Sequence, residues 1–252
     1  MRPAPALFTL GLLSASAMGC APFGSLDGEW TGGEQGRTRW QTLDGLCPGI
    51  GGGCDFDVPI AVGAQVTLAV DGIDGAAVTA AFTGGVEGAG AIEVESEHDT
   101  RVPIRVIAEG PGRTELSDAN GALDAATIFG RTVTRLECGR WPRSQGIDWR
   151  MSGLEVSDDI TLPLTSFEEE SPPFTLACRA SDREGPILSA DAIEWTVLSG
   201  SELLEIGSTG LLVFPGSSAR GARIEAFTGA SGQAVVRAQI GNVSRDLTIT
   251  IE

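Results

Sequence analysis

The residues best suited to catalysis are the single histidine and the two acids beside it, in the run Glu97-His98-Asp99. A histidine base aligned by a carboxylate is one part of a hydrolytic triad, which also needs a nucleophile nearby. The sequence contains no Gly-x-Ser-x-Gly turn that would present a serine, and adjacent residues of a strand point to opposite faces. A solvent-exposed loop histidine is the favoured interpretation, so no catalytic residue is predicted.

Three acidic loops could offer oxygen ligands to calcium: Asp55-Phe56-Asp57, Asp71 to Gly75, and Ser157 to Asp159. Calcium takes about six to eight oxygens, and none of these loops has the EF-hand spacing with its closing glutamate. Aspartate also stabilises turns by accepting hydrogen bonds from its own backbone. Turn residues are therefore the favoured interpretation, with calcium between domains as the alternative, and neither a metal ligand nor a cofactor is predicted.

The amino-terminal segment combines one charge (Arg2), an apolar stretch and small residues leading to Cys20, which is typical of a secretory leader and too short for a membrane span. The run Ala17-Met18-Gly19-Cys20 resembles the lipobox of bacterial lipoproteins, although Ala17 stands where that family usually has leucine. The resemblance implies a signal peptide over residues 1–19, acyl chains such as palmitate on Cys20, and an envelope location. Ala21, in place of an aspartate, favours the outer membrane. An ordinary leader cut at a nearby small residue is the alternative.

The charge balance limits the partners of the chain. Seventeen basic residues against 34 acidic ones give a net charge of −17. Nucleic acid needs a basic face that neutralises phosphate, and anionic lipid needs a polybasic patch, so both are excluded as docking partners. Any hold on the membrane is therefore expected from the lipid on Cys20.

Four further cysteines, an even number, favour two disulfides in an exported chain. Sequence alone allows three pairings of Cys47, Cys54, Cys138 and Cys178. Cys47 with Cys54 is favoured because the proline and glycines between them can fold a short loop, which leaves Cys138 with Cys178. A zinc site is disfavoured because paired Cys-x-x-Cys units are missing.

Short alternating segments, rich in Val, Ile and Thr and separated by Gly, Pro and Asp clusters, predict an all-β chain. Val66, Leu68 and Val70 share one strand face, and so do Leu247, Ile249 and Ile251. We expect two antiparallel β-sandwich domains in tandem, at residues 55–138 and 139–252. A glycine-rich tether over residues 20–54 would precede them, with Trp30 and Trp40 packing onto the first sandwich.

The strands around Trp195 resemble those of bacterial immunoglobulin-like domains. The segments concerned are Asp191 to Val197, Leu203 to Ile206, Gly232 to Ala238 and Leu247 to Ile251, and the first block has a similar opening strand in Ile60 to Leu68. The resemblance implies two immunoglobulin-like sandwiches. Antibody-type domains pair a cysteine before the tryptophan with one in a late strand. Here Cys178 precedes Trp195 but no cysteine follows, so the resemblance points upstream to Cys138, and the bond would staple the joint between domains.

Aromatic and basic residues are densest around that joint, which we place at Gly139 to Gly146. The cluster contains Trp141, Trp149, Arg140, Arg143 and Arg150. Trp and Arg are enriched in binding hot spots, but they also suit a buried interface between domains, which is the favoured interpretation.

Together these features predict a non-catalytic envelope lipoprotein that acts as a structural or binding module for a protein or glycan. Binding by sandwiches usually lies in end loops, so Ser157–Asp159, Phe167–Pro173 and Ser181–Gly185 are the candidate loops. A carboxylate-dependent envelope hydrolase and a subunit of an envelope complex are the alternatives.

Overall fold

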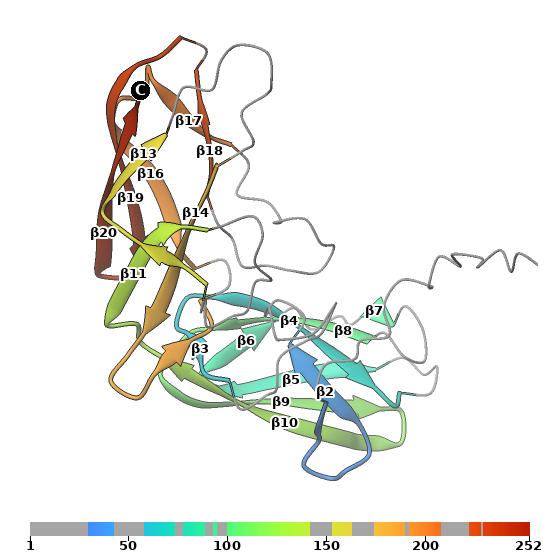
Figure 1. The fold of residues 1–252 in the computed structure, drawn as a ribbon. Helices are drawn as coiled ribbons and strands as arrows, with labels where there is room; N and C mark the ends of the chain where they lie inside the picture. Colours follow the sequence, from blue (N-terminus) through green and yellow to red (C-terminus); the bar gives the residue numbers. More distant parts are fainter. Residues whose placement is uncertain are drawn as a thin grey trace, which may run out of the picture.

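The structure is a computed structural model that describes residues 30–42, 58–73, 78–88, 93–94, 100–141, 153–162, 174–189, 192–207, 222–227 and 229–252. Within these ranges every regular element is a strand, and no helix there is long and apolar enough to cross a membrane. Cys20, Cys47, Cys54, His98 and the loop Phe167–Pro173 lie outside them. Figure 1 shows two sandwiches that meet at a bend, one blue to green and the other yellow to red.

Ten strands build each sandwich. The first contains β1 (Thr31–Gly32), β2 (Arg39–Thr42), β3 (Ile60–Ala61), β4 (Gln65–Asp71), β5 (Thr79–Gly84), β6 (Val86–Gly88), β7 (Glu93–Val94), β8 (Thr100–Val106), β9 (Gly110–Asp118) and β10 (Gly121–Arg131). The second contains β11 (Arg135–Arg140), β12 (Glu155–Val156), β13 (Asp159–Leu162), β14 (Phe174–Ser181), β15 (Pro186–Ile187), β16 (Glu194–Ser199), β17 (Leu204–Gly207), β18 (Ala222–Ala226), β19 (Gly232–Ile240) and β20 (Val243–Ile251).

The two sandwiches repeat one strand order. Their four-stranded sheets run β3-β10-β9-β5 and β13-β20-β19-β16, and their six-stranded sheets contain β2-β4-β8-β6 and β11-β14-β18-β17. The first strand of each four-stranded sheet is parallel to its neighbour, and the main ladders are antiparallel. This is the A-B-E-D and C-F-G arrangement of immunoglobulin-like sandwiches. The predicted fold class is confirmed.

Alternation along the strands explains the layering. In β8, Val102, Ile104 and Val106 are buried while the residues between them are exposed, as the two-residue period of a strand requires. The long β9–β10 hairpin turns at Asp118 to Gly121, where the Asn120 N–H donates to the Asp118 carboxylate at 2.7 Å and Gly121 has a φ of 118°. Asp118 pairs with Gly121, so Ala119 and Asn120 are the two residues of the turn. The buried side chains of both sandwiches form one continuous apolar cluster.

The amino-terminal hairpin departs from the expected tether. Residues 30–42, which lie inside the predicted tether 20–54, instead form β1 and β2, and β2 pairs with β4. Trp40 is fully buried in the core. The glycine-rich composition concealed this hairpin because β2 has only four residues, of which Trp40 alone is apolar.

A buried carboxylate holds that hairpin to the far sheet. Asp124 of β10 is fully buried, and its two oxygens accept four backbone N–H bonds of 2.8–2.9 Å, from Gln35, Arg37, Thr38 and Ala125. The Thr38 hydroxyl adds a fifth bond at 3.0 Å. The loop passes so close that a Cβ at Gly33 would collide with the carboxylate. The hairpin thus lies in one sheet through β2 and is tied to the other through Asp124.

The same hydrogen bonds set the ionisation of Asp124. Burial raises the pKa of this carboxyl, but the backbone N–H bonds from Gln35, Thr38, Ala125 and Arg37 more than offset that effect and hold the pKa below its ordinary value of 3.8. A carboxyl whose pKa is lower in the folded state stabilises the fold above its unfolded pKa. That stabilisation is lost as the pH falls through the folded pKa.

Replacing Asp124 with asparagine is expected to lower the free energy of unfolding by about 2–3 kcal/mol, because the new NH2 group would face N–H donors that lose their acceptor. Urea unfolding measured from neutral to acidic pH should show the difference between wild type and Asp124→Asn shrinking below pH 3.8. Asp118→Asn, at the exposed turn of the same hairpin, is the matched control and should change stability by less than about 0.5 kcal/mol. Equal effects of the two substitutions would contradict this role.

Candidate interdomain binding surface

The three candidate loops differ in their position and in how their polar groups are bonded. Ser157–Asp159 is a closed turn, in which the Ser157 hydroxyl bonds the Asp159 backbone and Asp158 forms a bidentate ion pair with Arg245. Its polar groups are already engaged, so it serves the fold. Phe167–Pro173 lies outside the described residues. Ser181–Gly185 connects β14 to β15 and is the loop that lies at the joint between the sandwiches.

The Ser181–Gly185 loop is fixed by one carboxylate. Asp182 Oδ1 accepts the backbone N–H groups of Glu184 at 2.7 Å and Gly185 at 3.0 Å, and the Asp182 N–H donates to the Gly185 carbonyl at 3.0 Å. This is the turn chemistry expected of aspartate. The other oxygen, Oδ2, lies 3.4 Å from Nη1 of Arg131, which also pairs with Glu184. One side chain therefore shapes the loop and ties it to the first sandwich.

The chain crosses between sandwiches within residues 132–134. Strand β10 ends at Arg131 and pairs with β9, whereas β11 begins at Arg135 and pairs with β14 and β12. The expected boundary between residues 138 and 139 falls inside β11. The structure shows the break in the burial pattern: Val133 is buried at an odd position, whereas Ile128 and Leu136 are buried at even positions of a single alternation.

Backbone hydrogen bonds join the sandwiches a second time. Ile60 of β3 forms a parallel bridge with Leu188, so that the Ala61 N–H donates to the Leu188 carbonyl and the Leu188 N–H donates to the Pro59 carbonyl, both at 2.9 Å. Ile60, Leu188 and Val133 are buried in the shared apolar cluster. The joint therefore combines a covalent link, a backbone bridge, apolar burial and an ion pair, and it resists bending more than a simple linker would.

A shallow depression of about 350 Å³ lies beside this loop. Eight residues line it, and five of them carry charges of both signs: Glu137, Arg179, Ser181, Asp182, Arg183, Glu184, Gly185 and Pro186. Arg179 Nε donates to Glu137 Oε2 at 2.9 Å, and this hydrogen bond holds the pKa of the Glu137 carboxyl below its usual value. Arg183 is exposed and forms no ion pair or hydrogen bond with another residue of the described ranges. Charged groups of both signs at an open surface suit a partner that brings complementary charges.

Four described carboxylates have pKa values shifted downward, away from neutrality. Hydrogen bonds from arginine lower the pKa values of Glu34, Glu137 and Asp246, and backbone N–H bonds lower that of Asp124. A general acid needs a pKa shifted upward toward neutrality. Across the described ranges no group of three His, Cys, Asp or Glu residues is arranged to hold a metal ion.

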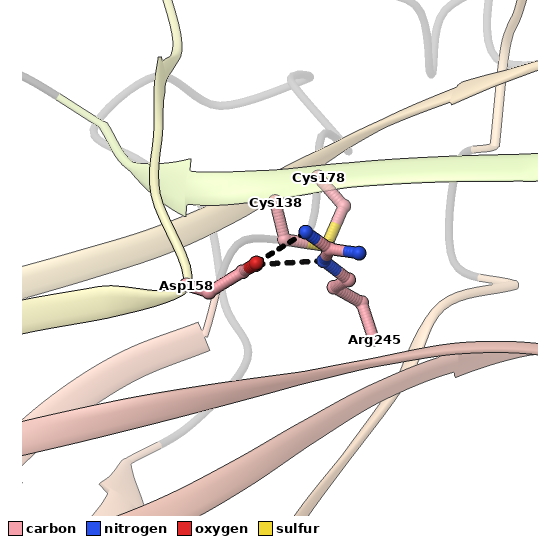
Figure 2. The surroundings of a disulfide bond; sticks show 4 residues. All are labelled: Cys138, Asp158, Cys178 and Arg245. Carbon is pink, nitrogen blue, oxygen red and sulfur yellow. Dashed lines mark hydrogen bonds and ion pairs between the residues drawn. A yellow bond between two sulfur atoms is a disulfide. The ribbon is translucent and has the colours of Figure 1, made fainter.

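A disulfide joins Cys138 of β11 to Cys178 of β14, as expected from the sequence (Figure 2). Both cysteines are buried, and they are direct partners in the β11–β14 register. The bond was expected to staple the joint, but both strands belong to the second sandwich, so it closes a loop within that domain. In the chain-entropy account, a loop of 40 residues gives about 4 kcal/mol of stabilisation. Cys47 and Cys54 lie outside the described residues, so their pairing stays a prediction.

The tryptophan expected at the joint lies elsewhere. Trp141 is buried, and its backbone N–H donates to the Thr175 carbonyl at the far end of β14 from Ser181. About six residues of strand, or roughly 20 Å, separate it from the crossover. It is therefore a packing residue of the second sandwich. Trp149, Arg143 and Arg150 lie outside the described residues.

None of the protein-family models matches this chain, and a search of curated proteins found no significant match. Several solved structures are similar. Domains 5–6 of the S-layer protein SbsC are 12% identical, with a TM-score of 0.28, over 77% of this chain and 93% of that one. The Escherichia coli adhesin FdeC is 12% identical, with a TM-score of 0.29, over 89% and 66%. The Yersinia pseudotuberculosis adhesin InvE is 14% identical, with a TM-score of 0.30, over 78% and 57%. All three are surface proteins: one S-layer protein and two adhesins.

Hydrogen exchange can test the backbone bridge at the joint. The amides of Ala61 and Leu188 should exchange slowly in the wild-type protein, because each donates across the joint. Leu188→Pro removes one donor, keeps an apolar side chain, and should accelerate exchange at Ala61 by about tenfold or more. Arg237→Gln breaks the exposed Arg237–Asp246 pair, which links β19 to β20 within the second sandwich and makes no bond across the joint, so this control should leave Ala61 unchanged. Fast exchange at Ala61 in the wild-type protein would contradict the bridge.

Proposed function

We propose that this protein is a non-catalytic lipoprotein of the bacterial envelope, which holds a polar binding surface at a fixed place away from the membrane. The observation that carries the proposal is the joint: a three-residue crossover, a backbone bridge and the Arg131 ion pairs hold the two sandwiches together. A stiff pair of sandwiches presents its end loops in one geometry, which a flexible chain of domains cannot do.

The anchor in this proposal is the acylated Cys20 in the outer membrane. The support comes from the leader-like residues 1–19 and the lipobox-like run that ends at Cys20. More than one acyl chain is needed for stable anchoring, since one chain alone binds only marginally. A net charge of −17 opposes adsorption to anionic lipid, so the lipid would carry the whole attachment.

The partner in this proposal is a protein or glycan that recognises the depression beside Ser181–Gly185. Arg183 stands exposed there beside the Glu137–Arg179 pair and the acids that bond Arg131. Charges at the rim of an interface mainly set encounter rate and orientation. A partner with an acidic group for Arg183 and donors for Glu184 fits this surface.

Replacing Cys20 with alanine tests the anchor. The wild-type protein should fractionate with the outer membrane and carry an acylated amino terminus by mass spectrometry, whereas Cys20→Ala should leave the membrane fraction. Cys47→Ala keeps Cys20 and should stay in the membrane fraction, which separates lipidation from general effects of losing a thiol. Release of the wild-type protein with an unmodified amino terminus would overturn the anchor.

A photo-crosslinking residue placed at Arg183 in living cells tests the binding surface. It should capture a discrete envelope protein or glycan, because the side chain projects from the exposed loop beside the depression. The same residue at Ala122, exposed on β10 of the first sandwich, is the matched control and should capture much less. Equal capture from both positions, or none from Arg183, would count against this surface.

A further inference from the structure

The outer face of the sheet β3-β10-β9-β5 carries an exposed apolar pair. Phe129 of β10 is 44% exposed, and its direct partner in the antiparallel register, Pro111 of β9, is exposed as well. Direct partners lie on the same face of a sheet, so the ring and the proline form one apolar surface, the Phe129–Pro111 platform. Among the side chains that the structure describes, Phe129 and Phe227 are the two exposed aromatic ones, and Phe227 lies just after β18.

Carboxylates outnumber arginines on one side of the platform. Glu34, from the amino-terminal hairpin, accepts the Thr127 hydroxyl at 3.0 Å and pairs with Arg113 at 3.0 Å. Arg113 also pairs with Glu115 at 2.6 Å, so two carboxylates share one guanidinium. Thr127 and Phe129 lie two residues apart on the same face of β10, which separates them by about 7 Å. The ring therefore borders a group with an excess of one negative charge.

The charges on the opposite side of the platform do not offset this excess. Arg131, two residues beyond the ring on β10, pairs with both Asp182 and Glu184. Arg183 adds a second positive charge to that loop. Glu109, which accepts a backbone N–H of the crossover at 3.1 Å, adds a third carboxylate. Carboxylates thus outnumber arginines by one on this side as well.

The first sandwich contains one aromatic ring that already holds a cation beside a carboxylate. The Arg39 guanidinium carbon lies 5.6 Å from the centre of the Trp30 ring, and the same guanidinium pairs with Asp71. The face of an aromatic ring attracts a cation, and a carboxylate next to it strengthens the hold on that cation. An aromatic ring and neighbouring carboxylates also occur together at Phe129, but no arginine of the described ranges lies over that ring.

We propose that the Phe129–Pro111 platform binds a basic segment of a partner protein, with one arginine or lysine side chain over the ring and a second beside Glu34 and Glu115. Pro111 offers apolar surface to the aliphatic stem of the first side chain. The net charge of −17 attracts such a segment, and the local excess of carboxylates orients it. This inference rests neither on the lipid anchor nor on the depression beside Ser181–Gly185.

Fluorescence anisotropy with a labelled peptide of four Gly-Arg repeats tests the proposal, with the protein from residue 20 onward carrying Cys20→Ser. Phe129→Ala should raise the Kd by about threefold or more, because the attraction of the ring is lost. Phe227→Ala removes the other exposed ring, is the matched control, and should leave the Kd unchanged. Phe129→Trp should bind more tightly than wild type and Phe129→Leu more weakly, since tryptophan attracts cations most strongly and leucine has no ring.

The carboxylates give a second measurement with the same peptide. Glu34→Gln should raise the Kd by about twofold or more, whereas Glu194→Gln, at an exposed acid of β16, changes the net charge equally and should not. Equal effects of these two variants would show general attraction to an acidic protein and would overturn the proposal. Undiminished binding by Phe129→Leu, equal binding of a peptide of Gly-Gln repeats, or self-association that Phe129→Ala abolishes would overturn it too, because another occupant would then fit the platform.

Discussion

The short crossover between the sandwiches constrains the whole molecule. Three residues reach about 10 Å at full extension, so the end of β10 and the start of β11 must lie close together. That proximity brings Ile60 beside Leu188 and Arg131 beside Asp182. The Ser181–Gly185 loop follows β14, the partner of β11, and so it lies at the joint in turn. The position of the Ser181–Gly185 loop therefore follows from the length of the link.

In each sandwich, a charged residue of the last strand binds a segment from elsewhere in the same domain. The charge is negative in the first sandwich and positive in the second. In the first, Asp124 of β10 gathers the N–H groups of the amino-terminal hairpin. In the second, Arg245 of β20 holds Asp158, at the point where the chain passes from β12 to β13 (Figure 2). Asp124 contributes more to stability because its carboxylate is buried, whereas the Asp158–Arg245 pair is half exposed and screened by solvent.

The strands could be predicted from sequence because alternation is local. Val66 to Val70 and Leu247 to Ile251 became β4 and β20. Counting cysteines left three pairings open, and Cys138 with Cys178 was the pair that remained once the proline and glycines between Cys47 and Cys54 favoured a short loop there. The joint could not be predicted, since it depends on contacts between residues such as Ile60 and Leu188 that are far apart in the chain. The role of Asp124 was hidden for the same reason: its partners lie almost ninety residues away, in a segment that composition assigned to a tether.

The disulfide has a mechanical consequence for a molecule fixed at one end. If a partner pulls on the second sandwich while the amino terminus is held, tension enters that domain through β11. The covalent bond passes the load from Cys138 directly to Cys178, so the intervening polypeptide cannot be drawn out before the bond is reduced. Under a pulling force, the residues between Cys138 and Cys178 therefore add nothing to the length to which the domain can be extended.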